Sequence, residues 1–287
     1  MIAFQSLMYW ASFLTDCRTQ SAGDSARLLT NKILYFAEHA LFRLFGRSPH
    51  FNHDWAKSPF PLSSCIKWSR GLSAWYVIED LSSVISMEGA GGEPQEWILD
   101  GLLPGMVIID VGAHHGRYSV CASRKVGPAG LVVAVEPHPR NVEILEKNLS
   151  LNDIENVRIF PVACWSERTN LNSKSAALLA LHAVTWGQKN ESPLPGIPLD
   201  DLTKEQGFTR VDWIKVDVEG SELAVLEGAR ETLATFRPHL YLEYHRTLSS
   251  LNDWLVAHGY HVDRRTEDPH APGYGWILAS PVHAELR

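Results

Sequence analysis

The stretch from residue 106 to residue 118 constrains the fold of this chain more than any other. It opens with four apolar residues, Met106 to Ile109, and continues with Asp110 and a turn that contains Gly112 and Gly116. A short apolar run bounded by turn residues is typical of a buried strand in a parallel sheet. A strand, a glycine turn and a helix start in this order build a site for the polar part of a nucleotide cofactor.

Asp110 restricts the kind of ligand that this turn can hold. A carboxylate repels a pyrophosphate group but suits a neutral or cationic one. The turn therefore points away from a dinucleotide and toward a cofactor with an amino-acid end. The alternative interpretation of Asp110 is that it caps the helix that follows the turn.

Strands and helices alternate from about residue 93 onward. The predicted strands are residues 106–111, 131–136, 157–162, 213–218 and 239–244, and the predicted helices include 117–125, 141–149, 222–229 and 251–258. Two extended segments, 260–264 and 274–280, lie too close together for a helix between them and predict a closing antiparallel hairpin. We expect an α/β fold of Rossmann-like type, a mostly parallel sheet with helices on both faces.

Residues 1–92 are expected to form an N-terminal helical extension or cap, and residues 93–287 the cofactor-binding domain. Helical spacing extends over residues 1–48, whereas residues 49–75 indicate an irregular linker and residues 75–78 a short strand. The extension can pack on the core or on a second subunit as a homodimer, form a lid over a substrate pocket, or touch a membrane surface. The apolar start of the chain is shorter than the ~20 residues that a membrane span needs.

Composition narrows the functional class. The formal net charge is −7 and no long run of Lys or Arg occurs, so a partner nucleic acid is not expected. The four cysteines contain no CxxC pair, which is typical of reduced thiols in a cytoplasmic protein rather than of disulfides or a zinc site.

Polar side chains gather where the predicted strands end. In a parallel α/β sheet these carboxyl ends meet at one edge, where ligands bind. The residues at that edge are Asp110, Glu136, Ala163, Cys164, Asp217, Glu219, Glu243 and His245. Several carboxylates at one edge need a function, because an unpaired buried carboxylate is costly.

Five ordered motifs give the chain a resemblance to a known family. They are Asp110-Val-Gly-Ala-His-His-Gly-Arg-Tyr-Ser119, Val135-Glu-Pro-His-Pro139, Asn148-Leu-Ser-Leu-Asn152, Leu199-Asp-Asp-Leu202 and Ile214-Lys-Val-Asp-Val-Glu-Gly-Ser-Glu222. Together they resemble the S-adenosyl-L-methionine site of class I methyltransferases, and the FkbM family in particular, over about residues 95–265. Members of that family are mostly O-methyltransferases that act on hydroxyl groups of natural products, sugars and related molecules. His114 departs from the family, which usually has Asn there.

The resemblance implies a role for each matched residue. The methionine end of S-adenosyl-L-methionine (product S-adenosyl-L-homocysteine) is expected along Asp110, Gly112, Ala113, His114 and Gly116, with Tyr118 over it. Glu136 is expected to hold the ribose and Pro137 the adenine edge, while Val162, Ala163 and Cys164 flank the adenine. Asp217 is expected to contact the cofactor or the acceptor.

Methyl transfer to an alcohol requires a group that removes the hydroxyl proton. His245 is the expected general base, because its unperturbed pKa lies near neutrality, and Glu243 is expected to orient it. Asp217 and Glu219 complete the expected catalytic group. Two alternatives remain: Asp217 and Glu219 can hold a divalent metal, although no metal is favoured, and Glu219 with Glu222 can simply favour a helix start.

Other functions compete with an O-methyltransferase. A nicotinamide-dependent oxidoreductase would use the same sheet, but the turn lacks G-x-G-x-x-G and Asp110 would face pyrophosphate. A cofactor-binding partner subunit without catalysis is the third possibility. The expected partner is a small molecule with a hydroxyl group that accepts the methyl group.

Overall fold

The computed structural model describes residues 17–45, 65–69, 72–79, 87, 95–171, 193–268 and 272–282. The first part of the expected N-terminal helix and most of the expected linker lie outside these residues. The chain divides into two compact units, one of residues 1–91 with 146–153 and one of residues 92–145 with 154–287.

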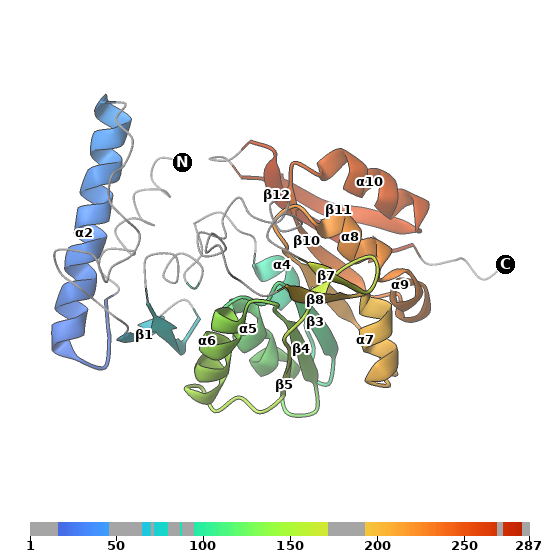
Figure 1. The fold of residues 1–287 in the computed structure, drawn as a ribbon, viewed down its shortest axis with the longest axis horizontal. Helices are drawn as coiled ribbons and strands as arrows, with labels where there is room; N and C mark the ends of the chain where they lie inside the picture. Colours follow the sequence, from blue (N-terminus) through green and yellow to red (C-terminus); the bar gives the residue numbers. More distant parts are fainter. Residues whose placement is uncertain are drawn as a thin grey trace. The chain divides into compact units, whose positions relative to one another are not determined.

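The larger unit contains a seven-stranded sheet with the order β11-β12-β10-β9-β3-β4-β5 (Figure 1). The strands are β3 (Val107–Val111), β4 (Leu131–Val135), β5 (Val157–Phe160), β9 (Trp213–Val216), β10 (His239–His245), β11 (Tyr260–Glu267) and β12 (Tyr274–Pro281). Neighbours from β10 to β5 pair in parallel, whereas β12 pairs antiparallel with both β10 and β11. The predicted fold class and the closing hairpin are confirmed.

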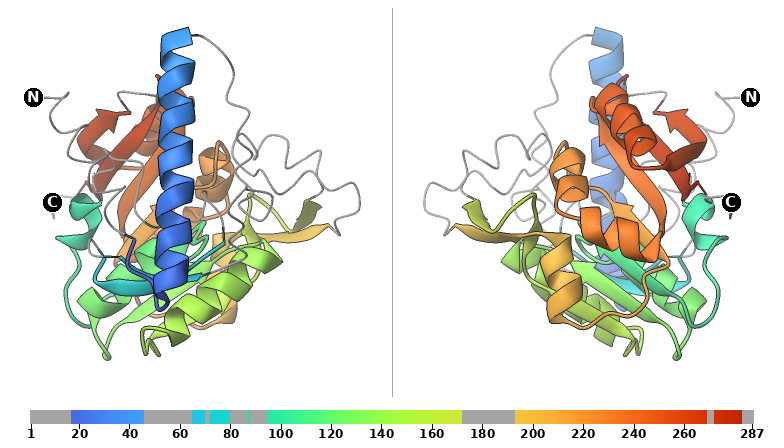
Figure 2. Two further views of the ribbon diagram at one scale, coloured as in Figure 1. Left: turned by 90° about the vertical axis from the view of Figure 1, so that its left-hand side faces the viewer. Right: turned by 90° about the vertical axis from the view of Figure 1, so that its right-hand side faces the viewer.

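Two apolar clusters cover the two faces of this sheet. Ile109 and Val111 belong to one cluster and Ile108 to the other, as the alternation of side chains along a strand requires. The helices are α4 (Glu96–Leu99), α5 (Arg117–Val126), α6 (Pro139–Ser150), α7 (Leu199–Glu205), α8 (Glu222–Glu227), α9 (Arg230–Phe236) and α10 (Leu248–Ala257). Helix α5 contacts β3 and β4, whereas α8 and α10 contact β10 (Figure 2).

The strand predicted over residues 157–162 is shorter than expected. It ends at Phe160, because Pro161 has no N–H group with which to continue the ladder. Residues 163 and 164 instead form β6 (Ala163–Cys164), which joins β7 (Thr169–Leu171) and β8 (Leu194–Ile197) in a second small sheet that the sequence did not predict.

The smaller unit contains α2 (Ala22–Phe45) and a hairpin of β1 (Cys65–Ser69) and β2 (Ala74–Ile78). The expected linker is therefore wrong over β1, and the short strand near residue 75 is right. Helix α2 begins only at Ala22, where Ser21 Oγ accepts the N–H of Asp24 at 3.3 Å as an N-terminal cap. No helix within the described ranges is long and apolar enough to cross a membrane.

Candidate active site

The expected residues meet at the point where the strand order of the sheet reverses. Strands β3 and β9 are neighbours, and the chain proceeds from β3 to β4 and β5 on one side and from β9 to β10 on the other. A ligand crevice forms at such a switch point, outside the carboxyl ends of the strands. Asp110, Glu136, Asp217, Glu243 and His245 all lie on or just after these ends.

Two glycines in the turn after β3 are required by close packing within the chain. Gly112 has φ +79°, and a Cβ added there would lie 1.8 Å from the carbonyl oxygen of Asp217. Gly116 has φ +90°, and a Cβ there would lie 2.3 Å from Cδ1 of Leu145. The glycine at position 112 thus lets the turn after β3 touch the loop after β9.

The structure explains why a histidine can stand at position 114. His114 has φ +49°, in the left-handed region. Asn, Asp and His adopt this conformation several times more often than other non-glycine residues. Replacing the usual Asn by His therefore keeps the backbone, and the N–H of His114 donates to Glu136 Oε2 at 2.8 Å.

Glu136 is a nearly buried carboxylate at the end of β4, 5% exposed. Its Oε1 accepts the N–H of His138 at 2.9 Å and Nδ2 of Asn141 at 3.1 Å, and its Oε2 accepts the N–H of His114. Burial raises the pKa of Glu136, although these hydrogen bonds oppose the shift. Since each carboxylate oxygen can accept about two donors, Oε2 retains room for a ligand hydroxyl.

Lys215, in the middle of β9, was not expected at the site. Its Nζ lies 3.1 Å from Asp110 Oδ1 and 3.5 Å from Asp217 Oδ2, and donates to the carbonyl of Gly112 at 3.0 Å. Ser119 Oγ donates to Asp110 Oδ2 at 2.7 Å. The chain itself thus pairs the buried carboxyl group of Asp110. In the sequence, Lys215 showed only as a single lysine within an apolar strand.

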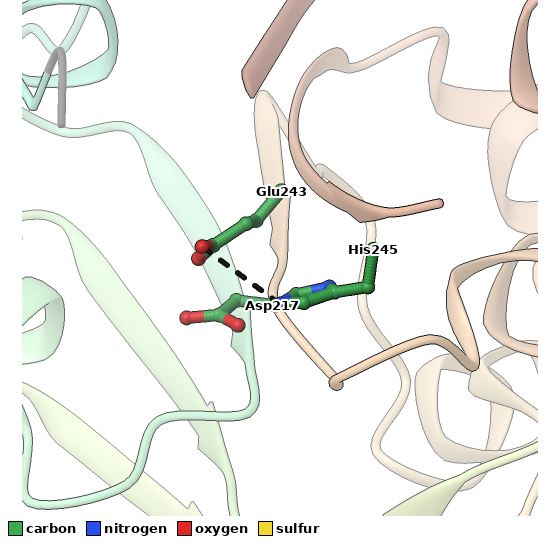
Figure 3. A group of neighbouring side chains, drawn as sticks. All are labelled: Asp217, Glu243 and His245. Carbon is green, nitrogen blue, oxygen red and sulfur yellow. Dashed lines mark ion pairs between the residues drawn. The ribbon is translucent and has the colours of Figure 1, made fainter. Parts of the chain in front are cut away.

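Asp217, Glu243 and His245 form a compact cluster at the ends of β9 and β10 (Figure 3). One potential ligand atom from each lies within 4.8 Å of the others. Because β10 continues through His245, Glu243 and His245 share a face, and Nε2 of His245 lies 3.8 Å from Glu243 Oε1. Burial alone would raise the pKa of Asp217, but the charges of Lys215 and His245 and a hydrogen bond with Glu243 lower it.

Glu222 is the closest partner of His245 and was not expected in that role. Its Oε1 lies 2.8 Å from Nδ1 of His245, while Glu219 Oε2 lies 3.2 Å from Nε2. Burial alone would lower the pKa of His245, but the hydrogen bond to Glu222 and the charges of Glu219 and Asp217 raise it.

The remaining expected cofactor contacts stay predictions. Tyr118 is buried, its hydroxyl donates to that of Tyr241 at 3.2 Å, and Lys215 Nζ lies 4.9 Å from its ring centroid. Ala163 and Cys164 are buried in β6, and burial raises the pKa of Cys164 to about 12. Ala113 is also buried, whereas Pro137 and Val162 are half-buried.

Comparisons with known proteins agree with this architecture. Among curated proteins, the chain is 30% identical to methyltransferase sdnD of Sordaria araneosa and 26% identical to protein-L-isoaspartate O-methyltransferase of Caenorhabditis elegans. Each match covers 43% of this chain and 60% of the relative, so the chain spans about 60% of the length of these relatives.

A methyltransferase FkbM from Methylobacillus flagellatus has a similar fold. Its solved structure superposes with a TM-score of 0.50 and 18% identity over 66% of this chain and 48% of that one. Residues 110–262 match the family model described as the methyltransferase FkbM domain. Because this match extends over more than half of the chain, the protein belongs to the FkbM methyltransferase family.

Proposed function

We propose that this protein is an S-adenosyl-L-methionine-dependent O-methyltransferase whose acceptor is a hydroxyl group of a small molecule such as a natural product or a sugar. The observation that carries this proposal is the placement of His245, whose Nε2 lies beside carboxylates at the switch point of the sheet. The family match supports methyl transfer, and the imidazole supports an acceptor that must lose a proton.

The charges of the site fit a cationic cofactor. The cluster contains five carboxyl groups but only two basic side chains: Asp110, Asp217, Glu219, Glu222 and Glu243 against Lys215 and His245. A cationic ligand lowers the electrostatic cost of this excess. When bound, S-adenosyl-L-methionine supplies an activated methyl group on a sulfonium. Glu136 is proposed to hold its ribose and the turn from Asp110 to Gly116 its methionine end.

His245 is proposed to accept the hydroxyl proton at Nε2. The charges of Asp217 and Glu219 stabilise the imidazolium that results, because opposite charges at this distance favour the protonated ring. The relative from Caenorhabditis elegans is named for isoaspartate in protein. A carboxylate acceptor has no proton to lose at neutral pH, so the arrangement around His245 favours a hydroxyl.

Calorimetry and a turnover assay test the proposal. We expect binding of S-adenosyl-L-methionine and S-adenosyl-L-homocysteine, and labelled methyl transfer to at least one member of a panel of hydroxylated compounds. Replacement of His245 by Ala should lower kcat about 10²-fold or more, a larger effect than any change in cofactor affinity. Absence of cofactor binding would refute the proposal, and binding without transfer to any acceptor would favour a catalytically inactive partner subunit.

A divalent cation at Asp217, Glu243 and His245 is a second candidate, favoured by the proximity of their ligand atoms. Such an ion can lower the pKa of an acceptor hydroxyl. Other contacts of these side chains argue for His245 as a general base instead. Nε2 of His245 faces Glu219, and the carboxyl group of Asp217 is paired with Lys215. We expect turnover to survive dialysis against a chelator. Loss of turnover, restored by magnesium or manganese, would establish the metal-assisted reaction.

A further inference from the structure

Glu222 is fully buried at the start of α8, and donors from three parts of the chain hold its carboxylate. Oε1 accepts the backbone N–H of Gly220 at 2.7 Å and lies 2.8 Å from Nδ1 of His245, and Oε2 accepts the hydroxyl of Thr247 at 2.9 Å. An ionised carboxylate has no proton to donate, so its 2.8 Å contact with Nδ1 of His245 requires a proton on Nδ1.

We propose that Glu222 is the positioning residue of the site, which holds His245 in the Nδ1–H tautomer. Nε2, which lies 3.2 Å from Glu219 Oε2 and 3.8 Å from Glu243 Oε1, is then the ring nitrogen left to accept a proton. This inference rests on the proposed role of His245 as base. A second ring nitrogen held by a carboxylate is the usual way in which a protein fixes the tautomer and the plane of a reactive imidazole.

A purely structural role for Glu222 accounts less well for its surroundings. A glutamate that only favours a helix start gains from the helix dipole while it stays exposed to water. Glu222 is instead withdrawn from water, which is costly for a carboxylate, and one of its partners is the imidazole. Its bond to Gly220 also fixes the loop that carries Glu219, whose φ is +52°.

Nitrogen NMR on the full chain with labelled histidine tests the tautomer directly. Above the pKa of His245, read from the same spectra, we expect the wild-type protein to show the proton on Nδ1. In Glu222→Ala the Nε2–H form should appear. A wild-type spectrum with the proton on Nε2, or an unchanged tautomer in Glu222→Ala, would overturn the inference. The wild-type spectrum alone suffices if the variant does not fold.

Kinetics of three variants separate positioning from folding. Glu222→Ala should lower kcat about 10²-fold with an unchanged Kd for S-adenosyl-L-methionine. Glu222→Gln keeps an acceptor for the N–H of Nδ1, so its kcat should lie much closer to that of the wild type than the kcat of Glu222→Ala does. The matched control is Glu227→Ala, on the same helix, where Glu227 Oε1 likewise accepts a ring N–H, that of Trp254 at 2.7 Å. Its kcat should stay within about twofold of wild type, as expected of a residue outside the site.

The two readouts distinguish the two proposals. If Glu222→Ala changes the tautomer of His245 but leaves kcat unchanged, Glu222 positions the imidazole and His245 is not the base. An unchanged tautomer in Glu222→Ala together with a large loss of kcat in His245→Ala would refute the role of Glu222 and keep the proposed function.

Discussion

Lys215 is a buried cation whose partners come from separate strands and turns. The sequence pattern did not predict that it would lie in the candidate site. Replacing Lys215 by Met would leave the buried carboxylate of Asp110 without its ion pair. We expect this to lower the free energy of unfolding by about 3–5 kcal/mol, measured by denaturant titration. Arg140→Met, at an exposed ion pair with Glu143, should cost less than about 1 kcal/mol. Equal losses in both variants would contradict the structure.

The pKa of His245 offers a test of its electrostatic surroundings. Its hydrogen bond to Glu222 and the charges of Glu219 and Asp217 raise this pKa in the free protein. A cation among the same carboxylates offsets their charge and should lower it again. We expect a lower pKa for His245 in the S-adenosyl-L-methionine complex than in the S-adenosyl-L-homocysteine complex, whose sulfur is neutral, as measured by NMR titration. The acidic limb of the kcat profile should then lie below the pKa of the free protein. Identical values in the two complexes would place the sulfonium away from His245.

Residues at the end of a strand or directly after it could be predicted, because their place depends only on where the strand ends. Asp110, Glu136 and Asp217 were found in this way. Glu222 and Lys215 escaped prediction, since their importance depends on which distant group each one meets. The left-handed backbone of His114 was equally invisible, although it explains the departure from the family.

The segment from Leu199 to Leu202 shows how one motif can organise two helices. Leu199 and Leu202 are buried in the core, whereas Asp200 accepts the N–H groups of Glu231 and Thr232 at 3.0 and 2.7 Å, at the start of α9. Neither α7 nor α9 was predicted, because each helix has only 7 residues and shows little periodicity. The cap of α9 is also hidden in the sequence, because Asp200 lies 31 and 32 residues before the N–H groups that it accepts.

The two adjacent aspartates of this motif form a matched pair for mutation. Asp200→Ala removes the acceptor for two N–H groups at a helix start and should lower the free energy of unfolding by about 1–2 kcal/mol. The side chain of Asp201, 33% exposed, pairs with Arg168 at the surface, so Asp201→Ala should cost less than about 1 kcal/mol. Thermal or denaturant unfolding measures both, and a larger loss for Asp201 than for Asp200 would contradict the capping role.

At the scale of the whole molecule, the division into units does not follow the chain. Residues 146–153 belong to the same unit as residues 1–91. Asn148 Oδ1 accepts the N–H of Val77 at 2.8 Å, and Asn152 bonds both the N–H and the carbonyl of Trp75 at 3.0 and 2.7 Å. The side chains of these two asparagines, one helical turn apart, thus hydrogen-bond backbone groups of β2 as a neighbouring strand would. The sequence showed these residues as a family motif but could not show what they bind.

Removal of residues 1–92 tests whether residues 93–287 bind the cofactor without the N-terminal extension. The candidate site uses only residues of the larger unit, so the fragment 93–287 should bind S-adenosyl-L-methionine with a Kd within about threefold of the full chain, by calorimetry.

The free energy of unfolding of this fragment should be lower than that of the full chain, because Asn148 and Asn152 lose their partners on β2. In the full chain, the double substitution Asn148→Ala with Asn152→Ala should lower the free energy of unfolding by about 1–3 kcal/mol for each N–H left unsatisfied. In the fragment the same double substitution should lower it far less, since the hydrogen bonds to β2 are already absent. The difference between the two losses measures how much the contact between the asparagines and β2 contributes to stability. Equal costs in the two contexts would show that the asparagines stabilise the protein in some other way, and loss of cofactor binding in a folded fragment would show that the first 92 residues complete the site.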